Sequence, residues 1–220
     1  MRGICKYFPG VRALHKVDFT LCEGEIHALM GENGAGKSTL IKVLTGVYEK
    51  DEGEIFLKGL DKPAVIHSPQ DAQNLGISTV YQEITLWPNL TVAENMYIGR
   101  TKGMGQNWKK MNRDADKILK SLGIPAEATQ QLSSCSIAVQ QMVAIARAVD
   151  MECKVLILDE PTSSLDDNEV EKLFGLMRDL KAKGVGIIFV THFLDQVYEV
   201  CDKITVLRDG QLVGEYEIEN

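Results

Sequence analysis

Residues 31–39 read Gly31-Glu32-Asn33-Gly34-Ala35-Gly36-Lys37-Ser38-Thr39 and fit the pattern G-x-x-x-x-G-K-[ST]. An apolar run at residues 26–30 precedes this stretch and a helical pattern follows from residue 39, so it joins a predicted strand to a predicted helix. Glycines let the backbone N–H groups of such a loop turn inward around phosphate groups, and the helix N-terminus adds a partial positive charge. The alternative is a glycine-rich turn without a ligand, and the flanking strand and helix argue against it. We therefore expect a phosphate-binding loop.

Two residues of this loop have separate expected tasks. Lys37 is expected to reach the β- and γ-phosphates of a nucleotide as a point charge, and Ser38 is expected to bind Mg²⁺. The residues that we expect to contact nucleotide in the loop are Gly31, Glu32, Asn33, Gly34, Ala35, Gly36, Lys37, Ser38 and Thr39.

A second motif follows an apolar strand at residues 154–158 and continues Asp159-Glu160-Pro161-Thr162. The strand places Asp159 at its carboxyl end, where α/β sheets present the groups that bind ligands. Asp159 could hold Mg²⁺ through water, and Glu160 could polarise an attacking water molecule. Two acidic residues after an apolar run are common, so the motif alone also fits a polar strand end. Its combination with the phosphate loop favours the catalytic interpretation.

Strand and helix patterns alternate along the chain, which predicts an α/β fold, a P-loop core with a mostly parallel sheet. The antiparallel-looking start and a closing hairpin with an Asp209-Gly210 turn suggest an added β-subdomain. Consecutive helices suggest an inserted helical lobe at about residues 85–150, and the polar, glycine-rich stretch 99–107 is expected to be a mobile loop. Strands are expected at 17–21, 26–30, 54–58, 77–81, 154–158, 186–190, 204–208 and 211–216, and helices at 39–44, 69–74, 91–98, 109–122, 138–149 with Ser136 as N-cap, and 168–183.

Composition excludes several classes of protein. The 220 residues include 24 Lys and Arg against 31 Asp and Glu, for a net charge of −7, which argues against a nucleic-acid protein that relies on bulk charge. Apolar residues make up 45% and charged residues 25%, so neither disorder nor a coiled coil describes the whole chain. No apolar run approaches the roughly 20 residues of a membrane span. The five dispersed cysteines indicate reduced thiols in a cytosolic protein.

The chain as a whole resembles the ATP-binding domain of an ABC transporter, and four further features carry the resemblance. Gln82, after the strand expected at 77–81, matches the Q-loop glutamine, which implies a contact with Mg²⁺ and a position facing the membrane partner. Ser163-Ser164-Leu165-Asp166 matches the D-loop of that family. His192 matches the switch histidine near the γ-phosphate, and Phe8, 23 residues before the phosphate loop, matches the aromatic residue that stacks on adenine.

Two stretches of sequence narrow the resemblance to one subfamily of ABC transporters. Phe8-Pro9-Gly10-Val11-Arg12-Ala13-Leu14, together with residues 31–36, looks like the monosaccharide-import subfamily, whose members normally carry two such domains in tandem. Residues 190–198, VTHFLDQVY, resemble the first domain of galactofuranose-type importers.

The resemblance implies a subunit that binds and hydrolyses ATP with Mg²⁺ to drive import of a sugar through a membrane permease. Its implied partners are the permease subunits, a second ATP-binding domain in tandem or separate, and indirectly a periplasmic or extracellular sugar-binding protein, with no nucleic acid. The implied location is the cytoplasmic face of the cell membrane, as a peripheral subunit. The implied catalytic residues are Glu160, His192, Lys37 and Gln82, and the implied metal ligands are Ser38, Gln82 and Asp159.

One motif departs from the family pattern. The signature LSGGQ aligns with Cys135-Ser136-Ile137-Ala138-Val139, so Ser136 is retained while Ala138 and Val139 replace glycine and glutamine. A register on residues 132–134 keeps Leu-Ser but misplaces the helix, and we reject it. The resemblance implies that this degenerate signature serves the weaker of two nucleotide sites. It also implies another strand before Gly3 and a second domain after the closing hairpin, so a fragment of a tandem protein and a separate half both fit the sequence.

Two other functions compete with sugar import. A non-transport ABC ATPase acting on nucleic acid or ribosomes is disfavoured by the charge of −7 and by the absence of a basic block in the sequence. The stretch at residues 86–95 also resembles the coupling region of transporters. A small nucleotide kinase would share the phosphate loop but would not need Gln82 and His192 in these places.

Overall fold

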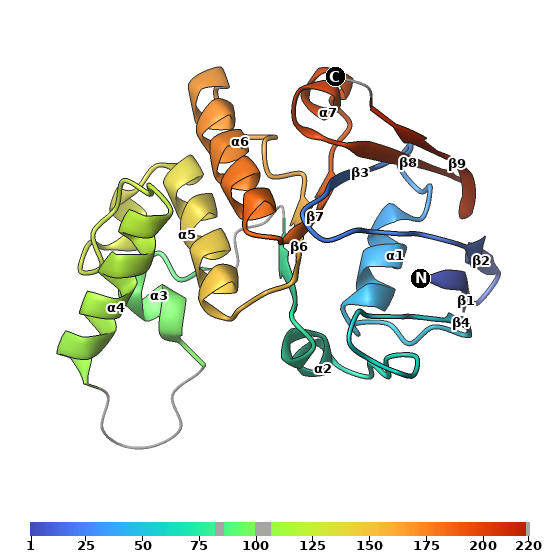
Figure 1. Ribbon diagram of the computed structural model, residues 1–220, viewed down its shortest axis with the longest axis horizontal. Coiled ribbons are helices and arrows are strands. Elements are labelled where there is room, and N and C mark those ends of the chain that lie inside the picture. The colour runs from blue at the N-terminus through green and yellow to red at the C-terminus, as the bar shows by residue number, and fades with distance from the viewer. Residues whose placement is uncertain (82–85, 100–106, 219–220) are drawn as a thin grey trace.

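The computed structural model describes residues 1–81, 86–99 and 107–218 (Figure 1). Its strands are β1 (Arg2–Phe8), β2 (Val11–Val17), β3 (Ile26–Met30), β4 (Glu52–Glu54), β5 (Ile77–Val80), β6 (Val155–Asp159), β7 (Gly186–Val190), β8 (Lys203–Arg208) and β9 (Gln211–Glu217). Its α-helices are α1 (Lys37–Leu44), α2 (Pro69–Asn74), α3 (Val92–Tyr97), α4 (Trp108–Ser121), α5 (Ile137–Asp150), α6 (Asp167–Ala182) and α7 (Leu194–Val200), and a short 3-10 helix spans Leu132–Ser134.

The central sheet has the strand order β5-β6-β7-β3-β8-β9, and all neighbouring strands are parallel except the closing hairpin of β8 and β9. This arrangement confirms the predicted mostly parallel sheet and the predicted hairpin. β7 is buried along its whole length, as expected for a parallel strand with both faces covered. Because β6 and β7 are neighbours in register, with Asp159 opposite Val190, their carboxyl ends meet at one edge of the sheet.

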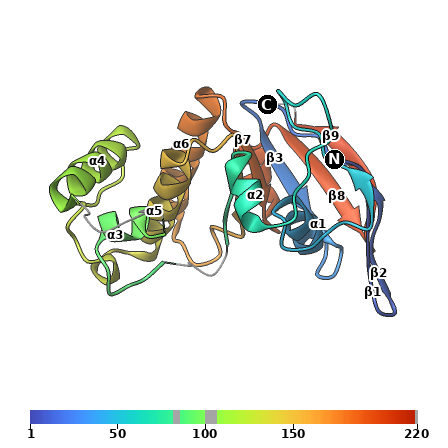
Figure 2. The same ribbon diagram turned by 90° about the horizontal axis from the view of Figure 1, so that it is seen from below.

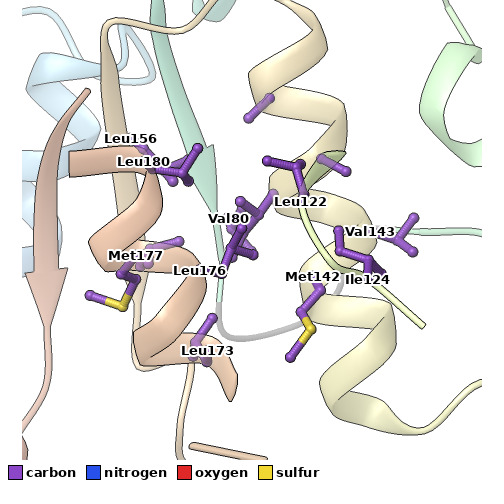
Figure 3. Packing of buried hydrophobic residues seen from close by; sticks show 14 of the residues in the cluster. Val80, Leu122, Ile124, Met142, Val143, Leu156, Leu173, Leu176, Met177 and Leu180 are labelled. Carbon is purple, nitrogen blue, oxygen red and sulfur yellow. The ribbon is translucent and has the colours of Figure 1, made fainter. Parts of the chain in front are cut away.

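Alternate residues of the central strands face two separate hydrophobic clusters. Leu156 of β6 and Phe189 of β7 belong to the cluster that includes side chains of α5 and α6, while Ile157 and Ile188 belong to the cluster that includes α1. In Figure 3, Val80 of β5 lies between the side chains of α6 and those of α5. The sheet is therefore a rigid layer between two cores, which fixes the positions of the loops at its carboxyl edge.

A smaller antiparallel sheet, ordered β2-β1-β4, lies beside α1 at the opposite side of the molecule from α4 (Figures 1 and 2). It confirms the added β-subdomain, but two expected strands are wrong. The strand expected at 17–21 shares only Val17 with β2, which ends there because the Asp18 carboxylate, not a strand carbonyl, accepts the N–H of Gly3 at 2.7 Å. The strand expected at 54–58 is β4 at Glu52–Glu54, after which the Ile55 carbonyl accepts from Ala64 at 2.7 Å.

Helices α3, α4 and α5 pack on one another, on the side of α6 that faces away from β3 and β8 of the central sheet (Figure 2). Each N-terminus is capped by a side chain: Thr91 forms a capping box with Glu94, the side-chain Oδ1 of Asn107 accepts from the Lys110 N–H, and Ser136 caps α5 as predicted. The division into a core and an inserted helical lobe at about residues 85–150 stays a prediction. The mobile loop expected at 99–107 lies largely outside the described residues.

The remaining predicted helices and strands are confirmed to within two residues at either end. β1, α7 and all of β2 before Val17 were not predicted. None of the helices in the described part of the chain is long and apolar enough to span a membrane.

Candidate functional site

The glycine-rich loop runs from the end of β3 at Met30 to the start of α1 at Lys37. Gly36 has a φ of +104°, and a Cβ there would lie 2.9 Å from the Ala13 carbonyl oxygen. A Cβ on Gly31 would collide with the Leu207 carbonyl oxygen. Both positions therefore require glycine, because the loop passes close to the β1–β2 hairpin and to β8. The predicted strand, loop and helix are all present in the expected order.

Lys37 points its amino group into the curve of the loop. Its Nζ donates hydrogen bonds to the carbonyl oxygens of Gly31 at 2.6 Å and Glu32 at 3.2 Å. Within α1, Leu40 donates to the Gly36 carbonyl at 2.8 Å, whereas the first N–H groups of a helix have no partner within it. These N–H groups belong to Lys37, Ser38 and Thr39, so the loop combines a cation with free donors. That combination fits the phosphate groups of a nucleotide.

Asp159 ends β6 and is half-buried beside this loop. Burial raises the pKa of its carboxyl group, the neighbouring Glu160 raises that pKa further, and the charges of Lys37 and Lys42 oppose the change. A negative charge held in such surroundings is stabilised by a cation. The described residues hold no group of three or more His, Cys, Asp or Glu side chains suited to a metal. Mg²⁺ nevertheless fits Ser38 and Asp159, because it commonly takes one or two protein ligands together with phosphate oxygens and water.

We expect Asp159→Asn to raise the melting temperature of the nucleotide-free protein at pH 7. The folded state raises the pKa of this carboxyl group, so ionisation costs stability as the pH rises through that pKa. Each kcal/mol gained corresponds to about 2–4 °C in a domain of this size. Differential scanning calorimetry at pH 7 and at a pH below the normal range of a carboxyl group checks this sign, because the difference should vanish in acid. An unchanged or lower melting temperature at pH 7 would show that the Asp159 charge carries no net penalty.

Glu160 and His192 come together although 32 residues separate them in the chain. His192 Nδ1 lies 3.7 Å from Glu160 Oε1. Glu160 has a φ of +47°, unusual for a residue with a side chain, and its N–H donates to the Val190 carbonyl at 2.9 Å. The Ser163 hydroxyl donates to the Glu160 carbonyl oxygen at 3.1 Å. The two side chains thus share one edge of the sheet with Asp159.

Phe8 lies at the end of β1 and is half-buried. Its ring centre lies 5.2 Å from that of Tyr48 in an edge contact, and Lys6 Nζ lies 5.6 Å from the Phe8 ring centre. Lys42 Nζ in turn lies 5.4 Å from the Tyr48 ring centre. An aromatic platform is thereby fixed in place, which suits stacking on a base. Tyr48 was not among the predicted site residues, because no motif or spacing in the sequence marks it.

Three predicted residues lie at helix starts, and one cannot be described. The Ser136 hydroxyl accepts from the Val139 N–H at 3.3 Å, and Ala138 beside it is buried. Asp166 caps α6 and forms a capping box with Glu169. Among the described residues no hydrogen bond or ion pair joins Ser136, Ala138 or Asp166 to the loop at 31–39 or to the Glu160–His192 pair. Gln82 lies outside the described residues.

The sequence of the chain is similar to those of ABC transporter proteins. Residues 14–163 match the model of the ABC transporter family. The chain is 57% identical over 217 residues to the galactofuranose transporter ATP-binding protein YtfR of Escherichia coli strain K12, covering 96% of this chain and 42% of that protein. It is 55% identical over 218 residues to the fructose import ATP-binding protein FruK of Bifidobacterium longum strain NCC 2705, covering 98% of this chain and 42% of that protein. The chain thus spans less than half the length of these curated relatives.

Solved structures show the same fold. A nucleotide-free ATP-binding cassette from an ABC transporter superposes with a TM-score of 0.88 at 28% identity, over 99% of this chain and 90% of the other. The ADP conformation of MJ1267, an ATP-binding cassette of an ABC transporter, gives a TM-score of 0.88 at 28% identity, over 98% of this chain and 89% of the other.

Proposed function

The chain belongs to the ABC transporter family, and we propose that it binds and hydrolyses MgATP to power import of a sugar through a membrane permease. The observation that carries this proposal is the meeting of Lys37 in its loop with Asp159 and the Glu160–His192 pair at one edge of the sheet. Support for the sugar comes from the relatives named above, which are sugar-import ATP-binding proteins.

In this proposal each residue has a distinct task in hydrolysis. Bound Mg²⁺ would neutralise charge on the phosphates, and Ser38 and Asp159 would hold it, with Gln82 as a further ligand. Lys37 would leave its two loop carbonyls and donate to phosphate oxygens. Glu160 would accept a proton from the attacking water through its carboxylate, and His192 would donate to the developing charge on the γ-phosphate. Phe8 would orient the base.

The proposed assembly places the chain at the cytoplasmic face of the membrane with permease subunits, a second ATP-binding domain and, indirectly, a sugar-binding protein. Reconstitution of the protein with its permease in liposomes tests this assembly. We expect MgATP-driven uptake of galactofuranose or fructose when the binding protein is supplied. ATP hydrolysis that responds to RNA or ribosomes and to none of these sugars would instead favour the non-transport alternative.

The degenerate signature at residues 135–139 is proposed to serve the weaker of two nucleotide sites. Ile137, next to Ser136, is 48% exposed, so its side chain changes the surface that a partner phosphate would meet. The Ser136 hydroxyl already has a structural task as the N-cap of α5.

We expect Ser136→Ala to change transport by less than about threefold while lowering the free energy of unfolding by about 1 kcal/mol through loss of the cap. Ser136→Gly is the matched control, because glycine at an N-cap costs only a few tenths of a kcal/mol. Uptake in the complete transporter and chemical denaturation of the protein measure the two effects separately. A transport loss as severe as that of Lys37→Ala would mean that residues 135–139 complete a working site.

A further inference from the structure

The loops that carry Glu160 and His192 are joined at a second point. The Thr162 hydroxyl donates a hydrogen bond of 2.7 Å to Oε1 of Gln196. Thr162 follows Glu160 by two residues, and Gln196 lies on α7, four residues after His192. This bond therefore ties the loop after β6 to the helix that begins just after His192.

The bond between Thr162 and Gln196 matters for the local structure because Thr162 is buried. Thr162 is only 5% exposed, and a buried hydroxyl without a partner costs free energy, so its bond to Gln196 is retained in the folded state. The start of α7 has two other hydrogen bonds: the Phe193 N–H donates to the Thr191 hydroxyl at 3.1 Å, and the Phe193 carbonyl accepts from the Val197 N–H at 3.2 Å. Phe193, the N-cap, makes no side-chain cap, and Phe193 and Leu194 are 40% and 51% exposed. Val197, fully buried, anchors the helix from the next turn.

The contact between the two functional side chains is looser than this bond. His192 Nδ1 and Glu160 Oε1 are 3.7 Å apart, and His192 itself is exposed. The backbone of Glu160 is held by Val190 and by the Ser163 hydroxyl, which fixes the Glu160 side of the pair. On the other side, the centre of the His192 ring lies 4.0 Å from that of Phe193, the N-cap of α7, so the position of His192 depends on where α7 begins.

We propose that Thr162 and Gln196 are positioning residues that set the geometry of the Glu160–His192 pair by locking the start of α7 to the loop after β6. The inference rests on the proposed ATP hydrolysis and assigns to that site two residues that do not touch nucleotide. A misplacement of about 1 Å at reacting groups can slow a reaction by about a hundredfold. A partial loosening of this link should therefore slow turnover and leave nucleotide binding intact.

Steady-state ATPase kinetics of the reconstituted transporter test the proposal. We expect Thr162→Val and Gln196→Ala each to lower kcat about tenfold with KM within about twofold, because both remove the bond and neither touches substrate. Thr162→Ser keeps the hydroxyl and should restore kcat to within about twofold of the wild type. The double variant should be no slower than either single variant, because the same link is lost in all three.

Thr205→Val provides a matched control. Thr205 Oγ1 of β8 lies 2.7 Å from His27 Nε2 of β3, both residues are fully buried, and this bond does not involve the loops that carry Glu160 and His192. Thr205→Val removes a buried threonine hydrogen bond of the same length as the bond that Thr162→Val removes. We therefore expect a similar decrease in melting temperature in both variants, but an unchanged kcat in Thr205→Val. An equal loss of kcat in Thr205→Val would show that Thr162→Val acts through general destabilisation.

A measurement without turnover separates this inference from the proposed function. The ring-proton NMR signals of His192, observed without nucleotide, should shift in Thr162→Val and Gln196→Ala and stay in place in Thr162→Ser. Unchanged signals, or a double variant whose loss is the product of the single losses, would overturn the link. If Thr162→Val does not fold, the kcat and the His192 signals of Gln196→Ala, a substitution on the partly exposed helix α7, decide whether the link exists. A wild-type transporter without ATPase activity would contradict the proposed function, and the NMR shifts would still decide the link.

Discussion

Replacing Lys37 by alanine is expected to weaken MgATP binding by at least tenfold and to remove nearly all hydrolysis. The amino group is enclosed by the loop and bonds only to the carbonyl oxygens of Gly31 and Glu32 among its described partners. A hydrogen bond from a charged donor contributes about 1.5–3 kcal/mol, which corresponds to about 10–100-fold in binding. Lys42, further along α1, does not replace it at this position, because its Nζ lies 5.4 Å from the centre of the Tyr48 ring.

Isothermal titration with MgATP measures the first effect, and phosphate release from the complete transporter measures the second. Lys58→Ala is a suitable control, since Lys58 is exposed and pairs with Glu23 far from the loop, and it should bind MgATP as the wild type does. Wild-type affinity and turnover in Lys37→Ala would remove the basis for a nucleotide site at residues 31–39.

The parts of the fold that could be predicted are those with a strong local pattern. β7 is a short apolar run bounded by glycine, and β8 and β9 flank an Asp-Gly turn, so pattern and turn chemistry agree. β1 and β2 were harder to predict, because bulges interrupt their pairing near Lys6. The alternation of apolar and polar residues also continues past Val17, although the strand ends there. α7 was missed because it has only 7 residues and buries only Val197 and Val200, which is too few to show a helical period.

The residues of the candidate site also fall into those that a local pattern predicts and those that depend on the packing of distant segments. Asp159 and Glu160 could be placed from the sequence alone, since a buried strand ends at them and parallel strands present ligand groups at that end. The contact of Glu160 with His192 requires β6 and β7 to be neighbours, and a strand order is not written in either segment. Tyr48 beside Phe8 and Gln196 beside Thr162 depend on side-chain packing across distant segments. Such contacts leave no periodic signal.

Replacing Glu160 by glutamine is expected to leave MgATP binding within about twofold of the wild type and to slow hydrolysis by about 10²–10⁴-fold. An amide has nearly the shape of a carboxylate but cannot accept the proton of an attacking water. The backbone at this position should be unaffected, because the N–H of residue 160 still donates to Val190 and the strain of its φ of +47° is similar for both side chains. His192→Ala should also slow hydrolysis, by removing a donor to the γ-phosphate.

The chain offers a matched control for this substitution. Glu152 lies before the other end of β6 with a φ of +55°, so Glu152→Gln makes the same chemical change in the same backbone conformation, away from the site. Equilibrium MgATP binding and single-turnover hydrolysis in the complete transporter, measured for both variants, separate binding from chemistry. Glu160→Gln should accumulate bound ATP, whereas Glu152→Gln should turn over normally. Normal turnover in Glu160→Gln would place the catalytic base elsewhere, and the 3.7 Å approach of His192 to Glu160 would then be a structural contact.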